Sequence, residues 1–183
     1  PRPSKKEEKM IAYLKAFGAK HNLETKVDEA GNVLIKKPAT PGKENLQTVV
    51  LQSHIDMVCE KNNDVQHDFL TDPIETEIDG EWLKAKGTTL GADNGIGVAT
   101  ELAILADDSI EHGPIECLFT VDEETGLTGA FALKEGFMNG DILLNLDSED
   151  EGELFIGCAG GIDSVGEFTY REVDVPAGYF CCK

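Results

Sequence analysis

The stretch TVVLQSHIDMV, residues 48–58, places a short apolar and β-branched run directly before a histidine and an aspartate. The run 48–51 has the composition of a buried strand. Polar residues that follow such a strand lie at its carboxyl end, where open α/β sheets form their sites. Because alternate residues of an extended segment face the same way, His54 and Asp56 can point at one site.

Two further apolar runs end in acidic residues in the same manner. Residues 115–121 lead to Glu123 and Glu124, and residues 141–146 lead to Asp147. Buried strands that alternate with helical segments predict an α/β domain with a mixed sheet flanked by helices. The acidic residues and His54 are expected to line one edge of that sheet.

Local patterns predict the remaining elements. The segment SKKEEKMIAYLKAFGAK predicts an amphipathic helix with Ser4 as its N-cap and an end near Gly18. GIGVATELAILA predicts a second helix that starts near Asn94 or Gly95. A hairpin is predicted over 23–35, a second one with a type I′ turn over 73–86, and a short helix over 128–134.

The segment GADNGIG, residues 91–97, contributes a further acidic candidate, Asp93. Its glycines allow the backbone to approach other groups closely, and Asn94 is a candidate for a strained peptide beside the site. A phosphate-binding loop is the competing interpretation. The segment lacks the Lys and Ser/Thr of such a loop and has an acidic residue where the phosphate would lie.

The candidates form a plausible ligand set for metal ions. One imidazole and three carboxylates, from His54, Asp93, Glu124 and Asp147, suit zinc, manganese or cobalt. Two such ions about 3.5–4 Å apart need a shared anion between them, and Asp93 is the candidate bridge. The competing interpretations are a buried core histidine for His54 and a solvated acidic loop around Glu124.

Two neighbours complete the predicted site. Asp56 can accept the ring N–H of His54 that faces away from the metal. The adjacent carboxylates of Glu123 and Glu124 are not expected both to bind metal, so one is left as a general base that takes a proton from a bound water. His21, His67 and His112 lie in polar stretches and are interpreted as surface residues.

Charge and cysteine content exclude other classes of function. The formal charge of −19 repels phosphate backbones and anionic lipid, so neither nucleic acid nor a membrane is an expected partner. The five cysteines are odd in number and form no CxxC motif, which favours a reducing compartment. No apolar run approaches the ~20 residues that span a bilayer. A cytoplasmic protein is expected.

The motifs SHIDMVCEKN, GTTLGADNGIG, FTVDEETGLTGA and NLDSE, in this order and at these separations, resemble those of the dinuclear zinc metallopeptidases. That family includes carboxypeptidases, aminoacylases and dipeptidases. The resemblance covers nearly the whole chain and is greatest to dipeptidases that cleave Xaa-His substrates. It implies metal-dependent hydrolysis of a small peptide by a metal-bridging hydroxide that a glutamate activates.

The resemblance also implies residue roles. One zinc would be held by His54, Asp93 and Asp147 and the other by Asp93 and Glu124, with Glu123 as general base and Asp56 orienting His54. Cobalt or manganese could replace zinc, and a homodimer is left open. The alternatives are a related deacylase or tripeptidase, or a noncatalytic metal-binding module.

The resemblance further predicts the domain organisation. Residues 1–160 would be the N-terminal part of the catalytic domain, and 161–183 the start of a lid or dimerisation domain. The boundary is placed at Gly160 and Gly161, after which apolar residues largely alternate: Val165, Phe168, Tyr170, Val173 and Val175. A further His ligand is expected from a segment beyond Lys183.

Overall fold

The computed structural model describes residues 1–148, 150, 152–158, 160–162, 164–171, 173–174 and 176–179. The chain divides into two units, Pro1–Glu149 and Asp150–Lys183. The boundary that the sequence places at Gly160 and Gly161 lies within the second unit, and it stays a prediction.

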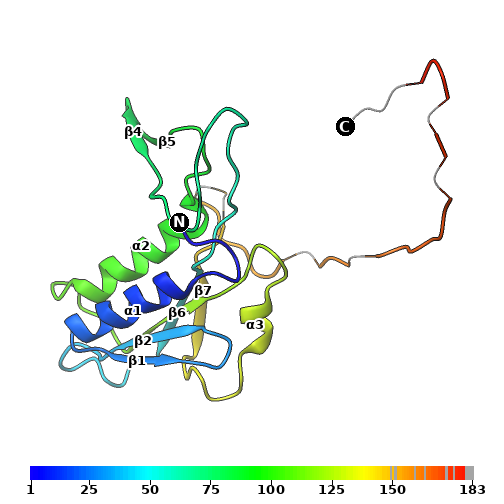
Figure 1. Cartoon of the computed structure of the whole chain (residues 1–183). Helices are drawn as coiled ribbons and strands as arrows, with labels where there is room; N and C mark the ends of the chain where they lie inside the picture. The colour runs from blue at the N-terminus through cyan, green and yellow to red at the C-terminus, as the bar shows by residue number, and fades with distance from the viewer. Residues whose placement is uncertain are drawn as a thin grey trace. The chain divides into compact units, whose positions relative to one another are not determined.

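Three helices and seven strands make up the first unit (Figure 1). In chain order they are α1 (Glu8–Lys20), β1 (Glu24–Val27), β2 (Val33–Lys37), β3 (Val49–His54), β4 (Thr76–Asp79), β5 (Trp82–Ala85), α2 (Ala92–Ala106), β6 (Ile115–Thr120), α3 (Thr128–Ala132) and β7 (Ile142–Asn145).

Five of the strands form one mixed sheet in the order β1-β2-β6-β3-β7. The β1–β2 and β2–β6 pairs are antiparallel, whereas β3 pairs in parallel with both β6 and β7. Since β3, β6 and β7 run in the same direction, the residues that follow them meet at one edge of the sheet. The predicted α/β class with a mixed sheet and flanking helices is confirmed.

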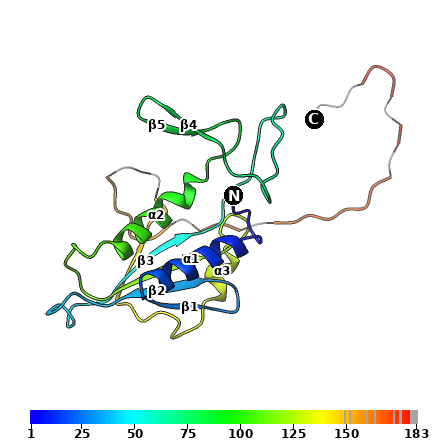
Figure 2. The same ribbon diagram turned by 60° about the vertical axis from the view of Figure 1, so that its left-hand side comes forward.

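The two long helices lie on the same face of the sheet (Figures 1 and 2). Their apolar side chains pack with those of β2, β3 and β6 in one buried cluster, which includes Leu14, Val33, Ile35, Leu51, Val98, Leu105, Cys117 and Phe119. A smaller cluster on the opposite face, Leu34, Val50 and Leu118, is covered by Leu133, Phe137 and Met138 from the segment after α3. Burial of apolar surface on both faces fixes the central strands.

The start of α1 differs from the prediction. The helix begins at Glu8 and ends at Lys20, and Ser4 is not its N-cap; Glu7 holds that position, without a side-chain cap bond. Pro3 instead forms a parallel bridge with Met57, and the Lys6 amide donates to the Pro3 carbonyl. The chain is therefore turned before the helix starts, and the Ser4 hydroxyl is directed elsewhere.

Other local predictions hold in outline. Both hairpins form, with Val27 opposite Val33 and Asp79 opposite Trp82. The second turn is not type I′, because that type needs positive φ at both central residues and only the first, Gly80, has it (φ 62°). The strand β3 extends to His54, and α3 is shorter than predicted.

The described residues of the second unit contain no helix or strand. The described residues of the alternating run that begins at Val165 form no strand. Val175 of that run and two of the five cysteines, Cys181 and Cys182, lie outside the described residues.

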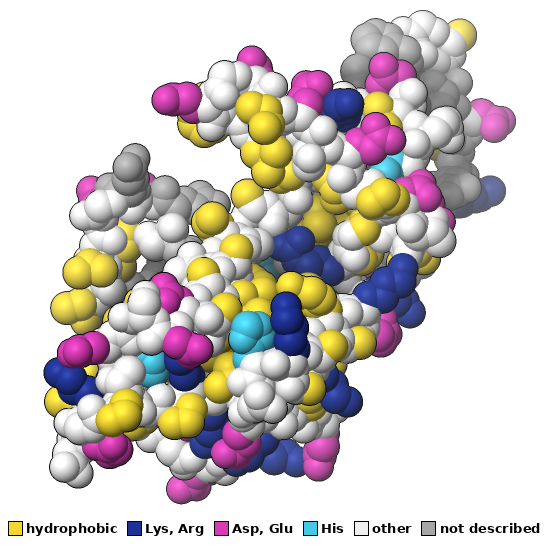
Figure 3. All heavy atoms as spheres, turned by 90° about the vertical axis from the view of Figure 1, so that its left-hand side faces the viewer, with side chains coloured by type: hydrophobic (Ala, Val, Ile, Leu, Met, Phe, Trp, Pro, Cys, Tyr) yellow, Lys and Arg dark blue, Asp and Glu magenta, His cyan; other side chains and the backbone are white. Residues whose placement is uncertain are grey.

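Basic and acidic side chains are interspersed on the face drawn in Figure 3. Such mixing of charges is typical of a solvated protein surface. No helix within the described part of the chain is both long and apolar enough to cross a bilayer.

Candidate metal centre

The ring of His54 is the point at which the predicted side chains meet. It ends β3 and is 1% exposed. Its Nδ1 lies 3.2 Å from Oδ1 of Asp56, and its Nε2 lies 2.9 Å from Oδ1 of Asp93. Asp147 Oδ1 and Glu123 Oε2 lie 3.6 and 3.9 Å from the same Nε2. Residues up to 93 positions apart in sequence thus converge on one nitrogen.

Asp56 fixes the orientation of that ring. Its carboxylate is fully buried and, besides facing His54, accepts hydrogen bonds from the Ser4 hydroxyl (2.7 Å) and from the amides of Glu123 (3.0 Å) and Glu124 (3.2 Å). Burial alone would raise the pKa of Asp56, but the contact with His54 and then these hydrogen bonds lower it well below its ordinary value. An ionised Asp56 holds Nδ1 of His54 and leaves Nε2 facing the other acids.

Burial and hydrogen bonding act in opposite directions on His54. Burial lowers the pKa of its ring, whereas the contacts with Asp56 and Asp93 and the charge of Asp147 raise it, with a net rise to about 9. The ring lies among carboxylates that favour a positive charge at this position. A metal ion bound through Nε2 would supply that charge in place of the proton.

The start of α2 carries Asp93 into the site. Gly91, the N-cap, has a left-handed backbone (φ 74°, ψ 33°), and Asp93 and Asn94 depart from helical dihedrals. The peptide bond between Asp93 and Asn94 is cis. The Asn94 side chain is buried; its Nδ2 donates to Asp147 Oδ1 (2.7 Å), and its Oδ1 accepts from the Gly97 amide. The start of α2 thus holds Asp93 beside His54, and the Asn94 side chain links this segment to Asp147.

The turn after β6 presents the two glutamates. Asp122 stabilises that turn by accepting the hydroxyls of Thr125 and Thr128. The ligand atoms of Glu124, Asp93 and His54 all lie within 4.8 Å of one another, so one cation could contact all three. The backbone amides of Glu123 and Glu124 each donate to one carboxylate oxygen of Asp56, which anchors both residues at the site.

The donor set fits a divalent cation. Burial raises the pKa of Glu123, Glu124 and Asp147, and nearby carboxylates raise each further. Carboxylates crowded around a single imidazole repel one another, and a bound dication would relieve that repulsion. One nitrogen with several carboxylate oxygens is the ligand chemistry that zinc, cobalt and manganese accept.

Sequence reasoning missed several residues around the site. The sequence pattern places Ser4 and Glu7 at a helix start, and it gives no role to Arg2. The acidic Glu101 within the otherwise apolar run of α2 was a visible signal that went unused. Its carboxyl is fully buried with both oxygens unpartnered, and burial raises its pKa to about 9, although the nearby Ser53 and Cys117 side chains lower it in part.

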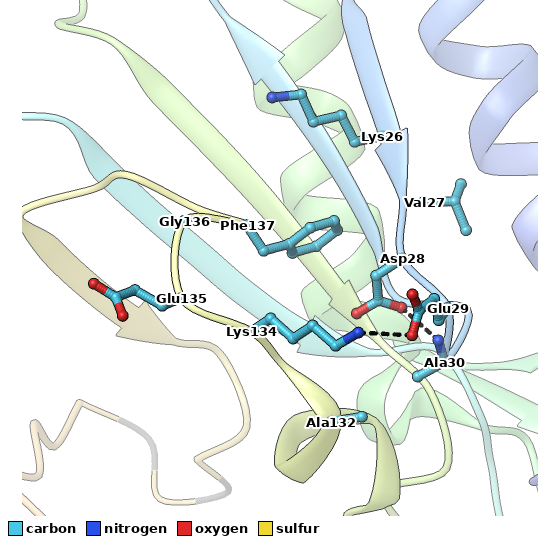
Figure 4. Close-up of a pocket in the computed structure, with 10 residues that line it drawn as sticks. All are labelled: Lys26, Val27, Asp28, Glu29, Ala30, Ala132, Lys134, Glu135, Gly136 and Phe137. Atoms are coloured by element: carbon cyan, nitrogen blue, oxygen red, sulfur yellow. Dashed lines mark hydrogen bonds and ion pairs between the residues drawn. The ribbon is translucent and has the colours of Figure 1, made fainter.

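A cavity of about 770 Å³ lies apart from these residues, between the β1–β2 turn and the segment after α3 (Figure 4). Two of its charged groups pair with each other, since Lys134 Nζ is 2.7 Å from Glu29 Oε2, and Asp28 accepts the amides of its own turn. None of the predicted site residues lines this cavity.

Comparison with known proteins agrees with the fold. Residues 50–174 match the model of peptidase family M20/M25/M40. The chain is 52% identical over 179 residues to the cytosol non-specific dipeptidase of Escherichia coli, covering 98% of this chain and 37% of that protein. The chain therefore spans a little over a third of the length of this relative.

Two solved structures share the fold. Aminoacylhistidine dipeptidase from Vibrio alginolyticus superposes with a TM-score of 0.81 at 60% identity, over 83% of this chain and 31% of that one. Aminopeptidase PepT from Bacillus cereus superposes with a TM-score of 0.68 at 27% identity, over 81% and 40%. The chain belongs to peptidase family M20/M25/M40, and the resemblance drawn from its motifs is confirmed.

Proposed function

We propose that the protein to which this chain belongs is a metal-dependent dipeptidase, with Xaa-His dipeptides as its first candidate substrates. The observation that carries the proposal is the convergence of His54, Asp93 and Glu124, whose ligand atoms lie within 4.8 Å of one another. The names of the two dipeptidase relatives support the substrate class. The cytosolic relative also supports a cytoplasmic location, and a small peptide is the proposed partner.

We assign the ligands as the sequence predicted. Two divalent ions, proposed to be zinc, would be held by His54, Asp93 and Asp147 and by Asp93 and Glu124, with Asp93 shared. When bound, such ions polarise a peptide carbonyl and acidify water. Cobalt or manganese would suit the same oxygen and nitrogen donors.

Glu123 is proposed as the general base. Its carboxylate lies 3.9 Å from His54 Nε2, and burial raises its pKa toward the range in which a carboxylate can accept and return a proton. Glu123 would take a proton from the attacking water and deliver it to the leaving amine. Asp56 would hold the backbone amide of Glu123 and the ring of His54 in place during that transfer.

The first experiment measures metal uptake by the purified chain and by Asp93→Ala in titration calorimetry with zinc. Uptake that Asp93→Ala abolishes supports the assigned site, and equal uptake by both proteins contradicts it. The second measures turnover in the full-length protein. Glu123→Ala should lose hydrolysis of Xaa-His dipeptides while it keeps bound metal, and full activity in that variant would contradict the assigned base.

A substrate panel separates the alternatives. A related deacylase would favour N-acyl amino acids, a tripeptidase would favour tripeptides, and a noncatalytic module would bind metal without turning over any of them. The proposed domain division at residue 160, with a lid or dimerisation segment after it, is tested by limited proteolysis and by the oligomeric state of the full-length protein.

A further inference from the structure

Residues 2–7, which we call the N-terminal strap, contact three of the four segments that carry the candidate ligands. These three segments are the end of β3 and the residues after it, the start of α2, and the turn after β6. The contacts link positions between 52 and 115 residues apart in the chain. No local sequence pattern predicts them.

The Ser4 hydroxyl binds the first segment. It donates to Asp56 Oδ2 at 2.7 Å, and Asp56 in turn faces His54 Nδ1 through its other oxygen. The hydroxyl makes this contact in place of capping α1, whose N-terminus has no side-chain cap. A locally favoured interaction is given up for one at the site, which is the pattern expected of a functional residue.

Arg2 joins the first segment to the second. Its carbonyl accepts the Met57 amide (3.1 Å), and Pro3 continues this contact as a parallel bridge to Met57. Its guanidinium Nη2 donates to the Gly91 carbonyl at 2.6 Å, two residues before Asp93. Because Nη1 of the same guanidinium donates to Met57 Sδ at 3.7 Å, this one side chain spans the distance between the loop that carries Asp56 and the loop that carries Asp93.

Two glycines of GADNGIG make room for that guanidinium. A Cβ added at Gly91 would lie 2.7 Å from Met57 Sδ and 2.9 Å from Arg2 Nη1, and a Cβ at Gly95 would lie 2.9 Å from Arg2 Nη2. All three distances are shorter than the van der Waals contact of the atoms involved. The close approach is therefore to Arg2 at Gly95, and to both Met57 and Arg2 at Gly91.

Glu7 binds the third segment. Its carboxylate is 5% exposed, and Oε1 accepts the Asp122 amide at 2.9 Å. Asp122 directly precedes the two glutamates of the site. The strap therefore touches the segments of His54, Asp93 and Glu124 through three separate contacts.

We propose that the N-terminal strap sets the relative spacing of the segments that carry His54, Asp93 and Glu124, with Ser4 and Arg2 as positioning residues of the metal site. Ser4 acts through Asp56 on His54, and Arg2 acts through Gly91 on Asp93. The inference rests on the proposed metal-binding function. Outer contacts of this kind change metal affinity about 10–100-fold when they are removed.

The test is the affinity of the purified protein for Co²⁺, followed by the visible absorption of the bound ion, together with thermal unfolding in the absence of metal. Ser4→Ala and Arg2→Ala should each weaken Co²⁺ binding about 10-fold. Ser4→Thr, which keeps the hydroxyl, should restore it. Ser109→Ala removes a comparable hydroxyl–carboxylate bond to Asp107 and should leave the affinity unchanged, as should Arg171→Ala.

A double-mutant cycle isolates the role of the guanidinium. Gly95→Ala should weaken Co²⁺ binding in the parent protein, because the new methyl displaces Arg2, but not in an Arg2→Ala background. Equal effects of Gly95→Ala in both backgrounds would overturn the role of Arg2.

The remaining outcomes are distinct from one another. If the parent protein binds Co²⁺ and the Ser4→Ala and Arg2→Ala variants bind it with the same affinity as the parent, the positioning role of the strap is overturned and the proposed function stands. Loss of affinity that merely follows loss of metal-free stability also overturns that role. Parent protein that binds neither Co²⁺ nor Zn²⁺ overturns both.

Discussion

The side-chain nitrogen of Asn94 lies 2.7 Å from Oδ1 of Asp147 and joins the start of α2 to the residues after β7. Asn94 is buried, and its own oxygen accepts the Gly97 amide. The amide therefore fixes one carboxylate of the candidate site and the first turn of the helix that presents Asp93. An aspartate at this position could not donate to Asp147.

Asn94→Ala removes both bonds. We expect metal affinity to fall about 10-fold, because Asp147 loses its orienting donor, and the free energy of unfolding to fall by about 1–3 kcal/mol, because a buried amide of Gly97 is left unpaired. Calorimetric zinc titration and denaturant unfolding measure the two effects. Asn63→Ala, at an exposed loop position, is the control. Unchanged zinc affinity in Asn94→Ala would show that Asp147 needs no such support.

Glu101 predicts how stability depends on pH. Burial raises its pKa to about 9 in the folded chain, above the ordinary value of 4.5. The contribution of the protonated Glu101 to the free energy of unfolding is fully present below about pH 4.5 and is lost as the pH rises through about 9. Between these values the unfolded chain releases the proton of this carboxyl, whereas the folded chain keeps it. The contribution declines by up to about 1.4 kcal/mol per pH unit in that window.

Glu101→Gln keeps the shape of the side chain and removes the titration. We expect the variant to gain stability relative to the parent as the pH is raised from 5 to 9, measured by denaturant unfolding at each pH. Glu81→Gln, on the exposed β4–β5 turn, should leave the parent's pH dependence in place. Parallel pH profiles for Glu101→Gln and the parent would show that Glu101 is already ionised in the folded chain.

The sheet, and the edge of it at which the candidate site lies, could be predicted from the sequence because both depend on local patterns of residues. The runs that became β3, β6 and β7 are apolar and short, and each is followed by an acidic or histidine candidate. Parallel pairing then brings their carboxyl ends together without further information. The positions of His54, Glu124 and Asp147 follow from that topology.

The contacts of Ser4 and Arg2 were not accessible in this way. Ser4 followed by Glu7 satisfies the local rule for a helix start, and nothing nearby reveals that a carboxylate 52 positions away accepts its hydroxyl. Arg2 likewise gives no periodic signal. Such long-range polar contacts depend on side-chain geometry, which hydrophobic pattern does not encode.

Gly129 allows α3 to pack tightly beside the turn that carries the site glutamates. A Cβ added there would lie 2.3 Å from the Val121 carbonyl oxygen and 2.6 Å from Asn32 Oδ1. Because backbone is one of the two neighbours, Gly129→Ala should lower the free energy of unfolding by about 1–3 kcal/mol. Thermal unfolding measures this effect. Gly166→Ala, where nothing lies within 4 Å of the added carbon, is the matched control, and equal midpoints for the two variants would contradict the prediction.

Lys37 stabilises the far end of α2. Its side chain is nearly buried, and Nζ donates to the carbonyls of Ile104 (3.0 Å) and Asp107 (2.6 Å) at a helix end that has no basic residue in its own last turn. Lys37→Met keeps the aliphatic stem but leaves those carbonyls without this donor. We expect the free energy of unfolding to fall by about 1–3 kcal/mol.

The same variant separates stability from metal binding. Asp93 is at the opposite end of α2, so zinc affinity of the folded Lys37→Met protein should equal that of the parent. Lys26→Met removes an ammonium that pairs with the exposed Glu24 and should change neither quantity. Unfolding midpoints in denaturant and zinc titrations on the three proteins test both statements. A Lys37→Met protein as stable as Lys26→Met would mean that solvent satisfies the end of α2 without the lysine.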